Sequence, residues 1–132
     1  MGTKQTVLVT EVTDGDTITI AGGDRVRVLG INAPEKGEQG YKPAKDYVFK
    51  TILNKEVLLE PDGPNRDQYG RLLRHVWLDG VLVGKEEVRL GLARAKYFNP
   101  NQKYKEEIAG AEEQARQENK GIWKQGNFMP GS

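Results

Sequence analysis

The sequence predicts an α+β fold in which a five-stranded Greek-key β-barrel of the OB type packs against about three helices. Short runs rich in β-branched residues come first, one segment with helical spacing interrupts them, and the C-terminal part of the chain has a helical pattern. The 132 residues suffice for one domain with its own core. We therefore expect a single domain over residues 1–132, ordered from about residue 6 to residue 124.

The N-terminal segment predicts a three-stranded meander. β-Branched residues are frequent in three short runs, at positions 6–12, 16–20 and 25–29. Gly22-Gly23 predicts a tight hairpin turn between the second run and the third. Because side chains alternate along a strand, Arg25 and Arg27 share one face of the third run. That face carries charge, and the opposite face is apolar.

A helix and two further strands are predicted next. Helical spacing of apolar residues predicts a helix from Pro43 to about residue 52, since proline suits a first helical turn. Strand patterns return at positions 56–60 and 72–78. The stretch between them, residues 61–66, has the composition of a loop.

The C-terminal part of the chain predicts a turn and two helices. Asp79-Gly80 is a turn signal, and apolar spacing predicts helices at residues 86–92 and 104–119. Gly121 ends the second helix. We expect the tail, residues 127–132, to fray.

Composition excludes several kinds of chemistry. The chain has no cysteine, so a disulfide framework, a thiolate zinc site and a thiol nucleophile are impossible. A single histidine, His75, excludes mechanisms that need two imidazoles and disfavours a transition-metal site. Any metal should therefore be a hard cation bound by oxygen. Lys and Arg (20) nearly balance Asp and Glu (19), so a phosphate must be bound by local charge.

The sequence shows no pattern that would place the chain in a membrane. No apolar run approaches the length of a membrane span, and the first residues lack the apolar core of a signal peptide. We expect either a cytoplasmic chain or a mature form whose export signal has been removed.

Three segments carry candidate functional residues, and the first is Asp14-Gly15-Asp16-Thr17. Two carboxylates flank a glycine at a junction between strands, a geometry that can direct oxygens at one cation. Asp-Gly is also the commonest hairpin signal, so this segment taken alone favours an ordinary turn.

The second segment runs from Arg27 to Glu35. Gly30 ends the charged strand and Pro34 stiffens the exit, which holds Asn32 and Glu35 on a loop at the edge of the barrel. The alternative is a solvated loop with Arg27 in an ordinary ion pair.

The third segment, residues 67–72, places Tyr69 and Arg71 at the start of a strand. The alternative here is another turn, with Arg71 merely exposed.

Taken together, these segments resemble the staphylococcal nuclease (thermonuclease) family. The motifs Asp-Gly-Asp-Thr, Arg-Val-Leu-Gly-Ile-Asn-Ala-Pro-Glu and Tyr-Gly-Arg occur in the order and spacing of that family, and Lys-Gly-Ile-Trp follows the last helix. The resemblance extends from about Val7 to Trp123. Each motif is weak alone, and the correct order of all four carries the resemblance.

The resemblance implies a calcium site. Asp16 matches a family aspartate that ligates calcium, and Asp14 would belong to the outer shell through water. Asn32 stands where the family usually has a second aspartate ligand, and Ala33 stands where a backbone carbonyl is the ligand. An amide oxygen can coordinate calcium but brings no charge, so we expect weaker calcium binding than in the usual family member.

The resemblance also implies the catalytic residues. Glu35 matches the glutamate that positions or deprotonates the attacking water, and Arg27 and Arg71 match two arginines that grip the phosphate. The chemistry needs such a set, because a cation and guanidinium groups must neutralise the charge that develops on the phosphate oxygens.

A substrate-binding surface is implied as well. Tyr69 matches a tyrosine that hydrogen-bonds a neighbouring phosphate, and Leu73 and Tyr97 fall where the family packs a nucleotide base. The family's second stacking tyrosine has no clear counterpart after Tyr97. Stacking favours unpaired strands, because a paired base hides its face.

These expectations give one leading hypothesis, a calcium-dependent endonuclease that hydrolyses DNA and RNA and prefers single strands. The family resemblance implies that it leaves 3′-phosphate ends. The alternative is a non-catalytic domain of the same fold that binds nucleic acid or a partner protein. Asn32 favours this alternative mildly, whereas the two arginines and Glu35 oppose it. We expect a monomer without membrane contact, extracellular or in the cell envelope by family resemblance, with a cytoplasmic location as the alternative.

Overall fold

A computed structural model describes residues 3–97, 100 and 103–124 of the chain. The tail expected to fray, residues 127–132, lies outside the described residues. None of the helices in the described part combines the length and the apolar character needed to cross a membrane.

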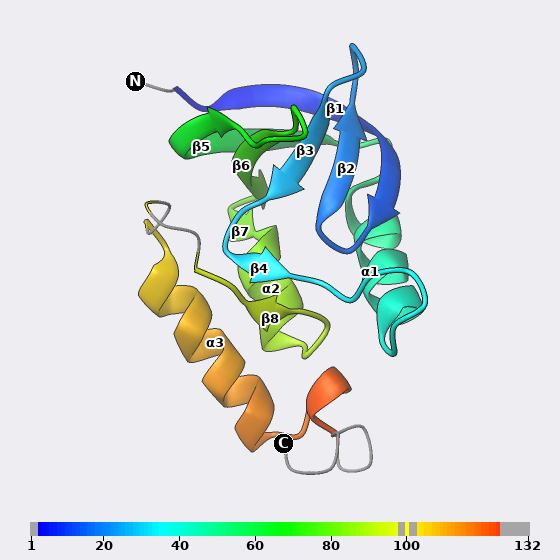
Figure 1. Ribbon diagram of the computed structural model, residues 1–132, viewed down its shortest axis with the longest axis vertical. Coiled ribbons are helices and arrows are strands. Elements are labelled where there is room, and N and C mark those ends of the chain that lie inside the picture. Colours follow the sequence, from blue (N-terminus) through cyan, green and yellow to red (C-terminus); the bar gives the residue numbers. More distant parts are fainter. Residues whose placement is uncertain (1–2, 98–99, 101–102, 125–132) are drawn as a thin grey trace.

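Five strands form a closed barrel, which is the upper part of the molecule in Figure 1. They are β1 (Gln5–Asp14), β2 (Thr17–Ile20), β3 (Arg25–Val28), β5 (Glu56–Arg66) and β6 (Leu72–Leu78). Antiparallel pairs join β3 to β2, β2 to β1, β1 to β5 and β5 to β6. A parallel pair between β3 and β6 closes the sheet on itself. The predicted five-stranded barrel is confirmed.

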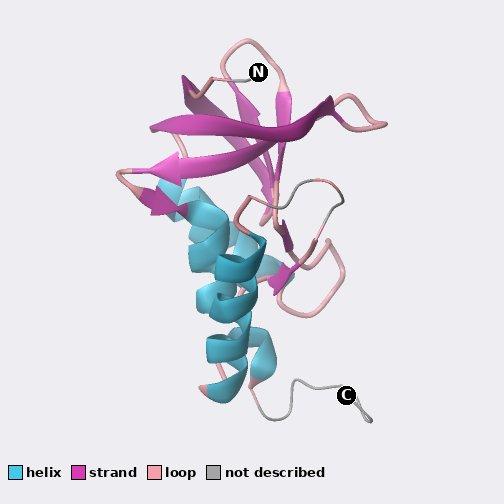
Figure 2. Ribbon diagram, turned by 90° about the vertical axis from the view of Figure 1, so that its left-hand side faces the viewer, coloured by secondary structure: helices cyan, strands magenta, loops and turns pink. Residues whose placement is uncertain are grey.

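Three helices gather at one end of the barrel, as Figure 2 shows. They are α1 (Tyr41–Ile52), α2 (Val83–Arg89) and α3 (Lys105–Gln117), and a short 3-10 helix, η1 (Gly121–Trp123), follows them. The chain also forms three two-residue strands that the sequence did not predict, β4 (Ile31–Asn32), β7 (Val81–Leu82) and β8 (Arg94–Ala95). Antiparallel pairing of β4 with β8 fixes the segment that leaves the barrel after β3.

Two predicted elements were wrong in their limits. Residues 61–66 are not a loop but the second half of β5, because Pro61 pairs with Arg74 and Arg66 pairs with Leu72 across an irregular stretch. The helix predicted at residues 86–92 begins and ends three residues earlier, as α2. It cannot continue through Gly91, whose φ is +76° and whose backbone lies against Lys120 and Gly121.

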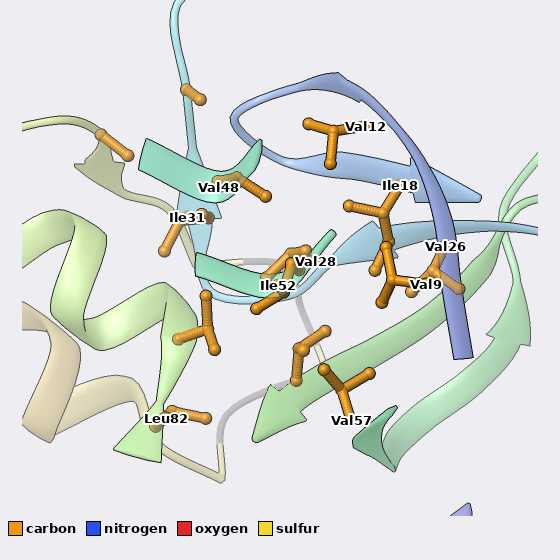
Figure 3. Close-up of a cluster of buried hydrophobic side chains, with 14 of the residues drawn as sticks. Val9, Val12, Ile18, Val26, Val28, Ile31, Val48, Ile52, Val57 and Leu82 are labelled. Carbon is orange, nitrogen blue, oxygen red and sulfur yellow. The ribbon is translucent and has the colours of Figure 1, made fainter. Parts of the chain in front are cut away.

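The core fills the space between the barrel and the helices. Figure 3 shows Val48 and Ile52 of α1 beside Val28 of β3 and Ile31 of β4. The fully buried apolar residues include Val9, Ile18, Val26, Ile31 and Ile52, each 0% exposed. This packing holds α1 against the strands that carry the three polar segments.

Candidate active site

The Asp14–Thr17 segment is a tight turn with ordered carboxylates. Asp14 ends β1 and Thr17 begins β2. The backbone N–H of Asp16 donates to Asp14 Oδ1 at 3.0 Å, and the Thr17 hydroxyl donates to Asp16 Oδ1 at 3.2 Å. A Cβ on Gly15 would lie 2.6 Å from the Cβ of Ala33, so this position requires glycine. The turn and the cluster of carboxylates are therefore the same feature.

The second polar segment meets this turn directly. The backbone N–H of Ala33 donates to Asp16 Oδ2 at 2.8 Å. Pairing of Ile31 with Ala95 and of Asn32 with Arg94 holds the loop at this position. Two segments that are separated in the chain are thus joined at one carboxylate.

Arg27 connects the same groups from β3. Its guanidinium donates to the carbonyls of Val28 at 2.6 Å and Ile31 at 3.0 Å, and to the Asn32 amide oxygen at 3.3 Å. Nη2 also lies 3.5 Å from Asp16 Oδ2. Burial lowers the pKa of Arg27, and the charge of Asp16 partly opposes that effect. Arg27 is only 8% exposed, so the charged face that the sequence predicted is buried at this position.

Arg71 approaches the turn from the start of β6. Asp67 fixes it, because the Asp67 carboxylate accepts from Arg71 Nε at 2.8 Å and from the Arg71 backbone N–H at 3.0 Å. Arg71 Nη1 lies 3.4 Å from the Thr17 hydroxyl oxygen, and its guanidinium lies 5.4 Å from the Tyr69 ring centroid. The third polar segment therefore reaches the first at Thr17.

Glu35 lies at the surface two residues beyond Ala33. Its side chain is exposed, and its backbone N–H donates to the Glu38 carboxylate at 2.6 Å. Glu38 in turn donates its own backbone N–H to the Glu35 carbonyl at 2.8 Å. The loop that carries Glu35 is thus turned back on itself, and no contact joins the Glu35 side chain to Asp16 within the described part of the chain.

The predicted substrate-binding residues lie in different environments. Tyr69 is 65% exposed and Tyr97 is 40% exposed, with Lys105 Nζ 4.1 Å from the Tyr97 ring centroid. Leu73 is half-buried and pairs with Arg27 in the parallel register of β3 and β6. Leu73 is therefore placed beside the arginine, and the two tyrosines present ring surface to solvent.

Oxygen atoms near Asp16 are of the kinds that a hard cation takes, but few of them carry charge. The carboxylates of Asp14 and Asp16 and the amide oxygen of Asn32 are oxygen donors of the kinds that calcium takes, and Ala33 contacts Asp16 through its backbone N–H. Among the described residues, no three His, Cys, Asp or Glu side chains are grouped closely enough to hold a metal ion. Burial raises the pKa of Asp14 to about 6, and a hydrogen bond with Asp16 and its negative charge add to this effect.

Sequence reasoning missed one acid near this site, Glu87 of α2. Its side chain is 0% exposed, and neither carboxyl oxygen has a hydrogen-bond partner in the described part of the chain. A signal was available, because Glu87 follows the buried Val83 by one helical turn and precedes the buried Val88. An acid on the apolar stripe of a helix is the sequence pattern that indicates a buried acid.

Comparisons with known proteins identify the family of the chain. Residues 25–125 match the family model described as Staphylococcal nuclease homologue. The chain is 38% identical over 129 residues to a thermonuclease of Staphylococcus hyicus, which covers 91% of this chain and 76% of that protein. It is also 38% identical over 128 residues to a thermonuclease of Staphylococcus intermedius, with 90% and 76% covered. An endonuclease of Bacillus subtilis is 33% identical over 130 residues, with 88% and 60% covered. The chain therefore belongs to the staphylococcal nuclease family.

Proposed function

We propose that this chain is a calcium-dependent endonuclease that hydrolyses DNA and RNA, prefers single strands and leaves 3′-phosphate ends. Its family makes it a nuclease, a hydrolase of phosphodiester bonds. One observation supports the finer proposal most strongly. Contacts of 2.8 to 3.5 Å link Asp16 to Ala33, Asp16 to Arg27 and Thr17 to Arg71, so the three polar segments meet at one place.

The two arginines bind the phosphate in this proposal. Arg27 approaches the Asp16–Thr17 turn from β3, and Arg71 approaches it from the residue before β6. A guanidinium stays protonated at neutral pH and can donate two parallel hydrogen bonds to phosphate oxygens. Arginines fixed by Asp67 and by the carbonyls of β3 and β4 need little rearrangement as charge develops on the phosphate.

Calcium, when bound, supplies positive charge at a phosphate oxygen. Asp16, the Asn32 amide and the Ala33 carbonyl are the proposed ligands, and Asp14 is proposed to act through water. The Asn32 oxygen accepts from Arg27 at 3.3 Å, so ligation at this position competes with that hydrogen bond. This competition is a second reason to expect weak calcium binding, in addition to the missing charge of Asn32.

Glu35 is the proposed base. Its exposed carboxylate follows the loop that Asp16 anchors through Ala33. Glu35 orients water and takes its proton as the water attacks the phosphorus. The bond between phosphorus and the 5′-oxygen breaks, and the 5′-oxygen leaves as a hydroxyl protonated from solvent. Loops that carry such groups commonly tighten when substrate binds, which suits an exposed base in the free protein.

Tyr69, Leu73 and Tyr97 are proposed to hold the substrate. Tyr69 donates to a neighbouring phosphate, while Leu73 and the exposed Tyr97 ring pack against a base. Flat apolar contacts of this kind accept every unpaired base, so heat-denatured DNA and RNA should be better substrates than duplex DNA.

The decisive test is digestion of heat-denatured DNA by the purified chain, with calcium and with a chelator. Wild type should cut only with calcium. Glu35→Gln and Arg71→Ala should each lower kcat by about 10²–10³-fold, because each removes one preorganised group of the transition state. Arg74→Ala is the matched control. Arg74 lies in β6, three residues after Arg71, and its guanidinium donates to Asn65 and not to the Asp16–Thr17 turn.

Undiminished cleavage by both variants would assign the activity to a contaminant or to another site. No cleavage by wild type, together with retained binding of single-stranded DNA, would favour the non-catalytic binding domain. Analysis of the product ends tests the 3′-phosphate independently, because 5′-phosphate ends would contradict it without touching the other parts of the proposal.

A further inference from the structure

Glu87 is a buried carboxyl group that the proposed mechanism does not use. It belongs to α2, is 0% exposed, and neither of its oxygens has a hydrogen-bond partner among the described residues. Burial of an unpaired polar group destabilises a fold by a measurable amount. Glutamate at this position therefore needs an explanation other than packing, which an apolar residue would serve better.

The carboxyl group faces the back of the candidate cation site. Glu87 Oε1 would lie 3.3 Å from a Cβ placed on Gly15, the residue between Asp14 and Asp16. Because Gly15 has no side chain, little separates the acid from the turn. The charges that act on Glu87 are those of Asp16, Asp14 and Arg27, which are members of the same site.

The site itself lacks anionic charge for a divalent cation. Asp16 is its carboxylate ligand in the proposal, and Arg27 lies 3.5 Å from that carboxylate and opposes its charge. Asn32, which stands where the family usually has an aspartate, is neutral. Affinity for calcium depends strongly on the number of charged groups around it. An additional carboxylate would correct this deficit.

Burial favours the protonated form of Glu87 in the calcium-free protein, so Glu87 can supply that charge, without touching the ion, by releasing its proton when the cation binds. No three acidic or histidine side chains of the described ranges are close enough to share one ion, so direct ligation by Glu87 is not indicated. Electrostatic interactions extend further in a protein interior than in water, because the effective dielectric constant is lower. A carboxylate behind the turn therefore acts on a cation in front of it.

We propose that Glu87 is an additional acidic member of the cation site, and that it supplies from the interior the negative charge that Asn32 does not bring to a divalent cation. This inference rests on the proposed calcium-dependent function. Glu87 contacts neither substrate nor reacting atoms, so it is a positioning residue for the cation. Its removal should change calcium affinity in the absence of any substrate.

The test is calorimetric titration of the whole chain with calcium alone. Glu87→Gln keeps the size of the side chain but cannot ionise when the cation binds, and it should weaken calcium binding about tenfold. Glu86→Gln, the same change one residue earlier on a half-buried position of α2, should leave the affinity within about twofold. Asn32→Asp added to Glu87→Gln should restore the affinity to about the wild-type level, a rescue that a purely structural role would not give.

The outcomes separate this inference from the proposed function. Equal affinity of wild type and Glu87→Gln, with binding abolished by Asp16→Asn, would overturn the inference and leave the calcium site intact. Absence of calcium binding in wild type would overturn both. If Glu87→Gln does not fold, Glu87→Leu, which suits the apolar face of α2, gives the same comparison.

Discussion

Two buried glutamates of this protein have opposite surroundings. Glu60 in β5 is 3% exposed and accepts hydrogen bonds from Trp77 Nε1 at 2.8 Å, from the Tyr104 hydroxyl at 2.7 Å and from Lys103 Nζ at 2.5 Å. Glu87 in α2 is 0% exposed, and no described residue donates to either of its oxygens. The first carboxylate is fully satisfied by the fold, and the second is not.

The pKa values of the two groups move in opposite directions. Burial by itself raises the pKa of Glu60, but the hydrogen bonds from Lys103, Tyr104 and Trp77 outweigh it and lower the pKa to about 2. Burial raises the pKa of Glu87 well above its usual value, and the negative charges of Asp16 and Asp14 raise it further. Hydrogen-bond donors, and not depth alone, decide which buried carboxyl is charged.

The two glutamates also lie in different parts of the fold. Glu60 joins the barrel to the start of α3, because Lys103 and Tyr104 immediately precede that helix. Glu87 lies beside the candidate cation site. A structural carboxylate has its donors within the fold, whereas the acid beside the site has no hydrogen-bond partner among the residues that the structure describes.

Removal of Glu60 should have the largest effect on stability. Glu60→Ala leaves the half-buried donors of Trp77 and Tyr104 without their carboxylate acceptor, which should lower the free energy of unfolding by about 3–4 kcal/mol. Urea denaturation at neutral pH measures the loss. Glu56→Ala, at an exposed position of the same strand, is the control and should change little. A loss below about 1 kcal/mol for Glu60→Ala would show that water replaces the carboxylate easily.

The dependence of stability on pH should differ in sign between the two groups. The pKa of Glu60 lies below its usual 4.5, so its contribution is complete above pH 4.5 and is lost as the pH falls towards 2. By about pH 3, Glu60 should have lost about 2 kcal/mol of its contribution to the free energy of unfolding. The pKa of Glu87 is raised, so the native state binds more protons than the unfolded state, and stability falls as the pH rises above 4.5.

Thermal unfolding without calcium, from about pH 3 to about pH 8, tests both signs with Glu60→Gln and Glu87→Gln. Glu60→Gln should flatten the acid limb of the profile, and Glu87→Gln should flatten the limb above pH 4.5. Profiles that run parallel to wild type would mean that the two glutamates titrate as in the unfolded chain.

Replacement of Glu87 by an apolar residue should stabilise the calcium-free protein. Glu87→Leu removes an unpaired buried carboxyl from a face that also contains Val83 and Val88, and it should raise the free energy of unfolding on the order of 1–2 kcal/mol. Urea denaturation in a chelator measures the gain, with Glu86→Leu as control. A destabilised Glu87→Leu would indicate that the carboxyl has a partner in the calcium-free protein after all.

Local pattern predicted the barrel strands and their main turns, because both depend on neighbouring residues. Gly22 and Gly23 adopt φ values of +99° and +100° in the predicted hairpin. The irregular half of β5 was not predictable in this way. Its proline and glycine favour a loop locally, and pairing with β6 overrides that preference.

The candidate site was also predicted only in part from the sequence. The order of motifs predicted that Asp16, Arg27 and Arg71 belong together, and the contacts place them at one turn. Burial of Arg27 was not predictable, because alternation along β3 says which face a residue occupies and not what covers that face. Glu87 was missed because the predicted helix began three residues late, so that Val83, one turn before Glu87 on the buried face, was left outside it.

The smallest expected effect concerns one donor of the satisfied glutamate. Tyr104→Phe removes the hydroxyl that donates to Glu60 but keeps the edge-to-face contacts of the ring with His75 and Trp77. It should cost about 1 kcal/mol in urea denaturation, and Tyr41→Phe, which removes an exposed hydroxyl, should cost less. In a Glu60→Gln background the loss of stability caused by Tyr104→Phe should be smaller, because a neutral amide is a weaker acceptor than a carboxylate. An equal loss of stability in both backgrounds would mean that the Tyr104 hydroxyl does not respond to the charge of Glu60. The contrast between Glu60 and Glu87 would then depend on how deeply each is buried and not on its hydrogen-bond partners.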